Sequence, residues 1–325
     1  MGQMPKILVT GGAGYIGSIT THHLLSSGFE VAVVDDLSRG HRGNVAPERL
    51  HVMRLQDTDG VARLLDGVDA VVHFAAHSAV GESMREPELY FSNNVGGTVS
   101  LLEAMARAGV RRLVFSSTAA VYGDPEKVPI PEDARLAPVN PYGESKAIVE
   151  KILTDLDHYR GLRSVALRYF NACGAEPDAG LGEDHSPETH LIPLLFKAVA
   201  TGKPIQILGN DYATSDGTCI RDYIHVSDLA TAHLAALDHL MAGGASGAFN
   251  VGTGKGLTVM EVLRAVEKVT GKPVPYKVAP RREGDPTELV ADSTKLQTTL
   301  GWQPQRSGIE DIVRDAWAYY QLKFN

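Results

Sequence analysis

Short runs of apolar residues alternate with longer, helix-like segments through the first half of the chain. Continuous apolar runs of this length are typical of parallel strands that are covered on both faces. The expected strands are Lys6–Thr10, Glu30–Asp35, Leu50–Leu55, Ala70–Phe74, Arg112–Ser116 and Ser164–Tyr169. The expected helices between them are Tyr15–Ser27, Thr58–Leu65, Tyr90–Ala108 and Tyr142–Tyr159. This alternation predicts an α/β fold with a doubly wound parallel sheet.

After about residue 171 the pattern changes to loops rich in Gly, Pro and Asp, which separate shorter elements. The loops predict surface segments of the kind that often carry specificity. The elements expected there are a helix at Leu194–Ala200, a strand at Phe249–Gly252 and a helix from the capping box Thr258–Glu261 to Val269. We therefore predict a first domain at 1–172 and a smaller substrate-binding α/β region at 173–325. Segments around 221–252 are expected to pack back on the first domain.

Composition narrows the function classes. The 325 residues include 43% hydrophobic and 22% charged residues and carry a net charge of −8, as in many globular enzymes. A negative chain without clustered Lys and Arg is not expected to bind nucleic acid or anionic membranes. Two cysteines, no signal peptide and no long apolar run favour a cytoplasmic protein with free thiols.

A glycine-rich turn directly after the first predicted strand indicates a dinucleotide site. Gly11, Gly14 and Gly17 form a Gly-x-x-Gly-x-x-Gly pattern between strand and helix, where a pyrophosphate can approach the backbone and the helix N-terminus. Asp35 ends the second predicted strand and can accept hydrogen bonds from an adenosine ribose. With Asp36 beside it, it favours NAD over NADP, and Arg39 keeps NADP open as an alternative. Asp57 is expected near the adenine, and Phe74, Ala75 and Ala76 near the adenosine and pyrophosphate.

A second constellation indicates proton transfer. Tyr142 and Lys146 are spaced i and i+4, so on a helix they share a face, and a neighbouring ammonium favours the phenolate of a tyrosine. Thr118, after the strand that ends at Ser116, adds a hydroxyl that can bond the reacting oxygen. An isolated Tyr-Lys pair usually means a lysine that covers a ring, and Ser or Thr at a strand end often caps a turn. The three residues together favour chemistry.

In this combination the motifs resemble the extended short-chain dehydrogenase/reductase family and, within it, the UDP-galactose (UDP-glucose) 4-epimerases. The resemblance covers essentially the whole chain. It rests on residues 10–18, 73–76, 80–83, 93–98, 115–123, 141–146, 168–171, 209–212, 221–226 and 281–285. It implies a Rossmann-type fold, reversible 4-epimerisation of UDP-glucose and UDP-galactose through a transient 4-keto sugar, and a homodimer.

The resemblance also assigns roles. It implies that Tyr142 is the base, that Lys146 binds the nicotinamide ribose and lowers the pKa of Tyr142, and that Thr118 is the catalytic hydroxyl. Further cofactor contacts are expected at Tyr15, Ile16, Thr58, Asn94, Ser116 and Tyr169. Substrate contacts are expected at Asn171, His190, Leu191, Leu208, Arg221, Tyr223, Arg282 and Asp285, in addition to Thr118 and Tyr142. Arg221 and Arg282 are expected at the diphosphate, with Asp285 on the uridine ribose or orienting an arginine. An ion pair of either arginine with Asp222, Glu283 or Asp285 is the structural alternative.

Two positions depart from the family pattern. Ser78 stands where some members carry Lys near the pyrophosphate, and Leu289 where others carry Tyr or Cys beside the sugar. The second departure leaves N-acetylated sugars open, and epimerases of UDP-pentose or UDP-hexuronate also remain alternatives. A 4,6-dehydratase is disfavoured because Ala119 and Ala120, rather than an acidic pair, follow Thr118. A non-catalytic NAD-sensing regulator would have no use for the Tyr-Lys-Thr set.

No metal site is expected. The two histidine pairs, His22 with His23 and His73 with His77, are not accompanied by a carboxylate cluster.

Overall fold

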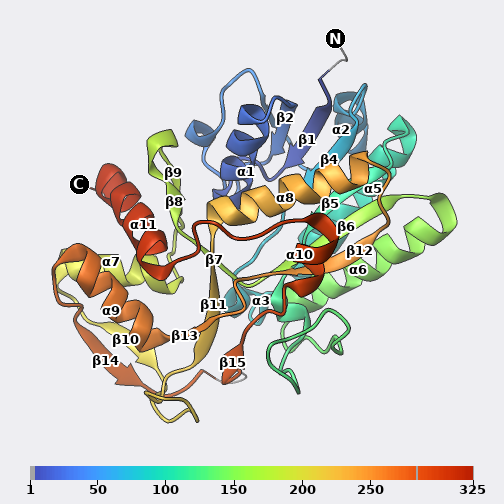
Figure 1. Ribbon diagram of the computed structural model, residues 1–325. Coiled ribbons are helices and arrows are strands. Elements are labelled where there is room, and N and C mark those ends of the chain that lie inside the picture. Colours follow the sequence, from blue (N-terminus) through green and yellow to red (C-terminus); the bar gives the residue numbers. More distant parts are fainter. Residues whose placement is uncertain (1–3, 283–284, 325) are drawn as a thin grey trace.

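A seven-stranded parallel sheet forms the centre of the molecule, in a computed structural model that describes residues 4–282 and 285–324. The strand order is β12-β6-β5-β4-β1-β2-β3, and every neighbouring pair is parallel. The strands are β1 (Lys6–Thr10), β2 (Glu30–Asp35), β3 (Leu50–Val52), β4 (Ala70–His73), β5 (Arg112–Ser116), β6 (Arg163–Tyr169) and β12 (Gly247–Val251). The predicted Rossmann-type doubly wound fold is confirmed (Figure 1).

Helices cover both faces of this sheet because alternate strand residues point in opposite directions. Ile7 and Val9 of β1 pack with α1 (Tyr15–Ser26) and α8 (Val226–Met241), whereas Leu8 belongs to the opposite core. That second core is completed by α2 (Thr58–Leu64), α5 (Gly97–Ala108) and α6 (Pro141–Arg160). Both layers are visible in Figure 1. The middle residues of the central strands β1, β4 and β5 are apolar because helices cover both faces there.

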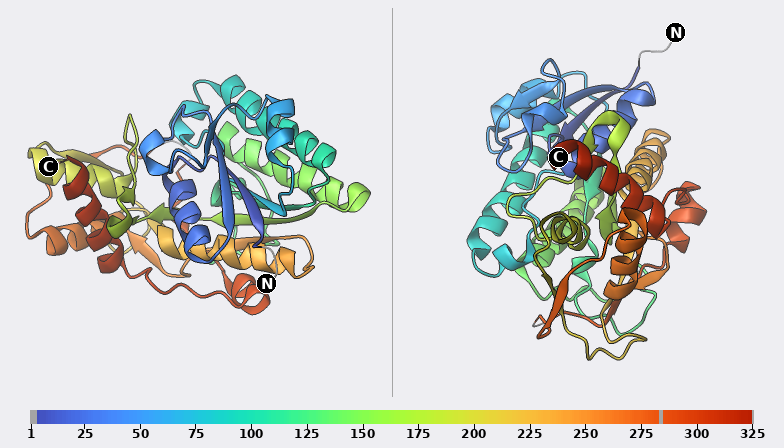
Figure 2. Two further views of the ribbon diagram at one scale, coloured as in Figure 1. Left: turned by 90° about the horizontal axis from the view of Figure 1, so that it is seen from above. Right: turned by 90° about the vertical axis from the view of Figure 1, so that its left-hand side faces the viewer.

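A smaller α/β region lies to one side of the sheet (Figure 2). Its core is formed by α7 (Leu191–Thr201), α9 (Val259–Thr270), α11 (Ile309–Phe324) and β10 (Ile205–Leu208), and β10 pairs with β14 (Tyr276–Ala279). The capping box predicted at the start of α9 is present, with Thr258 and Glu261 bonded reciprocally. The region therefore has its own apolar centre.

The remaining elements are short strands, helices and turns of both parts. The strands among them are β7 (Asn171–Cys173), β8 (Ala175–Glu176), β9 (Leu181–Gly182), β11 (Ile220–His225), β13 (Gly256–Thr258) and β15 (Glu288–Leu289). The helices and short turns are η1 (Arg42–Asn44), α3 (Val80–Ser83), α4 (Pro87–Tyr90), η2 (Phe91–Gly96), η3 (Ala119–Val121), η4 (Pro177–Ala179) and α10 (Thr294–Leu300). Among residues 4–282 and 285–324, no helix combines the length and apolarity that a membrane crossing needs.

The chain returns to the large sheet late in the sequence. The side chains of α8 pack on the face of the sheet, and β12 pairs with β6 at its edge, from Gly247 beside Val165 to Val251 beside Tyr169. Segments far apart in sequence thus share one sheet, while the division at residues 172 and 173 stays a prediction.

The helix expected at Tyr90–Ala108 is confirmed, with one feature that the pattern does not predict. The chain is helical without interruption from Pro87 to Ala108, as α4, the π-helical η2 and α5. The wider turn of η2 carries Asn94, whose buried amide bonds His77 O and Ser145 Oγ at 3.0 Å each. Two strands expected at 50–55 and 70–74 end earlier, at Val52 and His73, where the chain leaves the sheet at its carboxyl edge.

A buried ion pair joins β6 to α6 behind the sheet edge. Arg168 Nη2 lies 2.6 Å from Glu150 Oε2, both residues are almost wholly buried, and Arg168 Nη1 also donates to the Tyr122 hydroxyl at 2.9 Å. Burial opposes the charge, but the hydrogen bonds and charge of Glu150 raise the pKa of Arg168. Removing one member leaves the other charge buried without a partner.

We expect Arg168→Met to lower the free energy of unfolding by about 3–5 kcal/mol, because Glu150 is then unpaired. The matched control is Arg163→Met in the same strand, whose exposed pair with Asp157 at 3.1 Å is worth about 1 kcal/mol or less. Urea denaturation of the three proteins measures the difference. Equal losses for the two variants would contradict the assigned importance of the buried pair.

Candidate active site

One large cavity, of about 880 Å³, lies where the carboxyl edge of the sheet meets the smaller region. Both parts of the chain line it. Of the predicted site residues it brings together Gly11, Gly14, Tyr15, Ile16, Gly17, Asp35, Asp36, Phe74, Ala75, Ala76, Thr118, Tyr142, Lys146, Tyr169, Asn171, His190, Leu191, Leu208, Arg221, Tyr223, Arg282 and Asp285. The carboxyl edge of a parallel sheet is the usual ligand position in such folds.

The glycine turn forms a cradle that side chains would fill. Gly11 has φ +72°, and a Cβ there would lie 2.5 Å from Ala75 N. A Cβ on Gly17 would overlap Gly11 O. Gly14 is the N-cap of α1 and has no side chain to bond the first amides, so these face the cavity. The turn therefore fits the pyrophosphate of a dinucleotide.

Asp35 stands beside this cradle at the end of β2. Its Oδ2 accepts from Ala13 N at 2.9 Å and its Oδ1 from Leu37 N at 2.8 Å, so both carboxylate oxygens are held in place. Burial raises the pKa of Asp35, and the two backbone bonds oppose that rise. Each oxygen has a further lone pair for a ribose hydroxyl. This arrangement fits the adenosine half of NAD.

Tyr142 and Lys146 enter the cavity from the first turns of α6. The helix begins at Pro141 because Asn140 Oδ1 caps Gly143 N at 2.9 Å, and the predicted shared face is observed. Lys146 Nζ donates to Ser116 O at 2.8 Å and lies 4.8 Å from the centre of the Phe115 ring. Both side chains are buried. They line a part of the cavity wall that is separate from the glycine cradle.

Burial governs the ionisation of this pair. It raises the pKa of Tyr142 far above its ordinary value, and a hydrogen bond from Thr118 opposes this only in part. Burial also lowers the pKa of Lys146, to about 7. Desolvation is therefore the largest influence on both groups in the protein alone, and the expected lowering of the Tyr142 pKa by Lys146 stays a prediction. Thr118 also caps η3 through Ala120 N at 3.1 Å, so its capping interpretation is confirmed, while its catalytic role stays a prediction.

The far end of the cavity carries the cationic groups. Arg221 Nη2 lies 2.5 Å from Asp285 Oδ1, so the ion pair named as the structural alternative is present. Both residues also line the cavity, so the pair does not remove Arg221 from it. Asp222 takes no part, because its carboxylate accepts from Thr253 and Gly254. Leu289 stands beside Arg221 in the register of β15 with β11 and lines the cavity. Glu283, named as another partner, lies outside the described residues.

Comparison with known proteins decides the family. Residues 7–252 match the model of the NAD dependent epimerase/dehydratase family. The chain belongs to this family. A UDP-glucose 4-epimerase from Lactobacillus helveticus is 48% identical, over 97% of this chain and 97% of its own.

Solved structures agree with the sequence comparison. The UDP-glucose 4-epimerase of Brucella ovis in complex with NAD has a TM-score of 0.94 and 43% identity, over 97% of this chain and 98% of its own. The UDP-glucose 4-epimerase of Bifidobacterium longum in complex with NAD+ and UDP has a TM-score of 0.91 and 37% identity, over 98% of both chains. The resemblance that the motifs indicated is confirmed at the level of the family.

Four predicted cofactor residues of this epimerase/dehydratase do not line the cavity. Asp57 caps α2 by accepting from Gly60 N at 3.0 Å, and Thr58 is the first residue of that helix. The preceding residues Leu55 and Gln56 line the cavity instead. Ser116 presents its carbonyl to Lys146 from behind the wall. Asn94 Oδ1 accepts from His77 N at 2.8 Å. Asn94 and Ser116 therefore bond residues that line the cavity, and the cofactor contacts expected of all four stay predictions.

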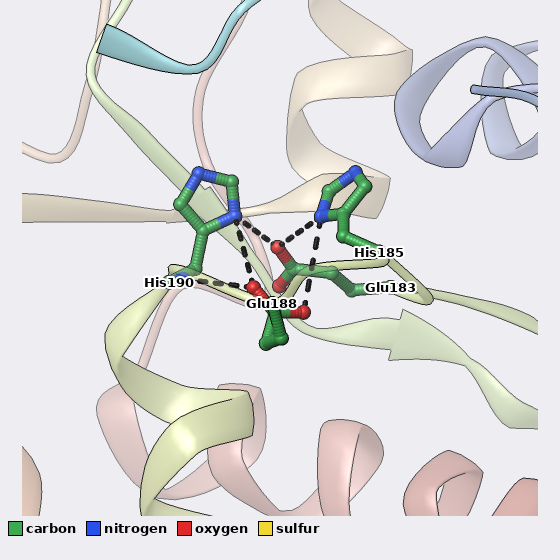
Figure 3. A group of neighbouring side chains, drawn as sticks. All are labelled: Glu183, His185, Glu188 and His190. Carbon is green, nitrogen blue, oxygen red and sulfur yellow. Dashed lines mark hydrogen bonds and ion pairs between the residues drawn. The ribbon is translucent and has the colours of Figure 1, made fainter. Parts of the chain in front are cut away.

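The sequence interpretation of the epimerase/dehydratase missed a cluster of two acids and two imidazoles. Glu183, His185, Glu188 and His190 follow β9, and their nearest ligand atoms lie within 4.8 Å of one another (Figure 3). The Nδ1 atoms of His185 and His190 both face Glu183 Oε1, the former at 3.2 Å. Such a set could hold a metal ion, but each imidazole already has a carboxylate partner. The alternation of Glu and His from 183 to 190 was the available signal, and the expectation of no metal stays a prediction.

Within this cluster, Glu183 and His190 each favour the charged form of the other. Burial raises the pKa of Glu183, but hydrogen bonds from His185 and His190 outweigh it and bring the value to about 2. Burial lowers the pKa of His190, but the bond and charge of Glu183 outweigh it and raise the value to about 9. His190 is therefore a cation at neutral pH on the wall of the cavity.

We expect this pair to make stability depend on pH. The pKa of His190 rises from 6.5 to about 9 on folding, so its stabilisation is complete below pH 6.5 and is lost as the pH rises to about 9. Because 54% of the His190 side chain is exposed, solvent screens the pair and we expect a loss of about 1 kcal/mol or less. His190→Gln should flatten this part of the urea-denaturation profile, and His158→Gln, at an exposed position in α6, should not. Identical profiles for wild type and His190→Gln would contradict the pairing.

Proposed function

We propose that this protein is a UDP-glucose 4-epimerase that interconverts UDP-glucose and UDP-galactose with NAD as its cofactor. One observation carries the proposal: a single cavity joins the glycine cradle and Asp35, the set of Thr118, Tyr142 and Lys146, and the arginines of the smaller region. A hydride acceptor, a proton carrier and an anion anchor are the three parts that this reaction needs. The similarity to epimerases from L. helveticus, B. ovis and B. longum supports it.

NAD would be held by the glycine turn and Asp35, and it would supply a reversible acceptor for the hydride of the sugar C4. The residues of the chain handle the accompanying proton. Tyr142 accepts the proton of the C4 hydroxyl and later gives it back, while Thr118 bonds the same oxygen and orients it. Lys146 is proposed to bind the nicotinamide ribose from the same helix face.

The burial of Tyr142 and Lys146 suggests how they ionise. An isolated phenolate and an isolated ammonium are both penalised there, as the directions of the two pKa shifts indicate. A phenolate with an ammonium beside it is a neutral pair and avoids much of that penalty. We therefore expect the two groups to change protonation as a unit rather than independently.

Epimerisation requires that the sugar turn over while the nucleotide stays in place. We assign the firm hold to Arg221 and Arg282, since guanidinium groups pair with phosphate oxygens in a bidentate way. Asp285 is proposed to orient Arg221, to which it is bonded. His190 adds a cation near the diphosphate, and Asn171, Leu191, Leu208 and Tyr223 complete the proposed wall around the substrate.

Another UDP-sugar remains the alternative substrate. Leu289 lines the cavity beside Arg221, so its side chain bears on which sugars fit. Comparing UDP-galactose with UDP-N-acetylglucosamine, UDP-pentose and UDP-hexuronate substrates decides between them. A dehydratase is disfavoured because Ala119 and Ala120 start η3 after Thr118 and offer no acid or base.

Four finer features also belong to the proposal. We propose a homodimer, a cytoplasmic location, a role in galactose metabolism, and a cofactor domain at 1–172 followed by a substrate region. They rest on the resemblance of the motifs to 4-epimerases.

We expect Tyr142→Phe to lower turnover of UDP-galactose by at least about 100-fold, because a general base contributes at least that much. NAD should remain bound, since the phenol oxygen alone is removed. The matched control is Tyr159→Phe in the same helix, at a side chain that faces solvent. Conversion is followed by NMR of the sugar anomeric protons, and the cofactor by extraction from the purified proteins. Near-wild-type turnover in Tyr142→Phe would refute the role of Tyr142.

A further inference from the structure

An ion pair spans the cavity above the glycine turn. Arg39 lies in the turn after β2, Glu82 lies in α3 after β4, and Arg39 Nη2 is 2.6 Å from Glu82 Oε1. In the sheet, β1 stands between β2 and β4. The pair therefore joins the segments that follow the two strands on either side of β1, next to the cradle, and both residues line the cavity.

Glu82 is held in this position from behind. The hydroxyl of Tyr90, which is fully buried, lies 2.9 Å from Glu82 Oε2 and 2.8 Å from Ala79 O, and these two acceptors share its single proton. One carboxylate oxygen thus serves Tyr90 and the other serves Arg39. Although burial raises the pKa of Glu82, the bonds from Tyr90 and Arg39 leave it lowered, so the group is an anion at neutral pH.

The position of Arg39 bears on the choice of dinucleotide. An adenosine 2′-phosphate is normally met by an arginine near the end of the second strand, the place that Arg39 occupies. Asp35 and Asp36 oppose such a phosphate, and the other nearby cation, Arg54, is 79% exposed and 3.9 Å from Asp36. Arg39 is consequently the cation best placed to compensate these acids, and Glu82 already holds it.

We propose that Glu82 is a specificity-determining residue that selects NAD over NADP by holding Arg39 across the cradle. With Glu82 in place, three carboxylates and a paired arginine face the adenosine ribose. When Glu82 loses its charge, Arg39 is released and can form a charge-assisted bond with a 2′-phosphate. The inference rests on the proposed function only through dinucleotide binding and does not depend on which sugar is converted.

The test is a double-mutant cycle on binding rather than on activity. Wild type, Glu82→Gln, Arg39→Gln and the double variant are equilibrated with NAD and a large excess of NADP. The bound dinucleotides are then extracted and quantified by chromatography. Gln keeps the shape of Glu82 and its bond with Tyr90, so the fold is retained, which thermal denaturation checks. Glu86→Gln is the control, the same change at an exposed residue next to α3.

We expect the bound NADP:NAD ratio to rise at least about fivefold in Glu82→Gln and to return to within twofold of wild type in the double variant. Arg39→Gln and Glu86→Gln alone should stay within twofold. An unchanged ratio in Glu82→Gln overturns the inference, as does a rise that persists in the double variant. A tenfold fall in Arg39→Gln also overturns it, because Arg39 would then already serve the phosphate. Wild type that binds neither dinucleotide would instead contradict the proposed cofactor.

Discussion

The close passage of the chain from β1 into α1 is the constraint on which the rest of the site depends. Gly11 N donates to Val34 O at 2.8 Å, and Thr10 O accepts from Phe74 N and Ala75 N at 2.9 and 3.1 Å. The exits of three neighbouring strands are thereby tied together. A side chain at Gly11 would collide with Ala75, so these bonds require glycine there. With the exits tied, Asp35, the small residues after β4 and the start of α1 surround one cradle.

The two ends of the cavity differ in charge. The adenosine end is acidic and holds its arginine in a pair, which suits ribose hydroxyls and opposes an added phosphate. The end in the smaller region contains Arg221, Arg282 and His190, which suit a diphosphate. Between them Tyr142 and Lys146 are buried, so their charges appear only where a partner compensates them. The same low polarity that shifts both pKa values strengthens the interactions of the charged pair.

Much of this arrangement could be predicted from the sequence, because it follows from local rules. The apolar runs predicted six strands of the large sheet and a further strand at 249–252. The structure places this further strand at the edge of the same sheet. The spacing of Tyr142 and Lys146 was sufficient because an α-helix fixes the direction of residues at i and i+4. The start of α9 followed from Thr258, whose side chain caps it as part of the predicted capping box.

What the sequence did not predict depended on contacts that the folded chain makes. Asp57, expected near the adenine because it follows β3, caps α2 through the Gly60 amide. The π-helical turn within 90–108 carries Asn94, whose partners His77 and Ser145 lie in other segments. The pKa of Tyr142 depends on burial, which no spacing reports. The pairing of Glu82 with Arg39 depends on the order of β4, β1 and β2, and strand order is a property of the folded sheet.

The central claim is that the hydrogen on the sugar C4 leaves and returns as a hydride within one cavity. UDP-galactose that carries deuterium at C4 tests it most directly, with the UDP-glucose product analysed by NMR and mass spectrometry in ordinary water. The account predicts that the deuterium remains at C4 of the product, because the hydride never meets solvent. Product with ordinary hydrogen at C4, and deuterium in the water, would contradict it.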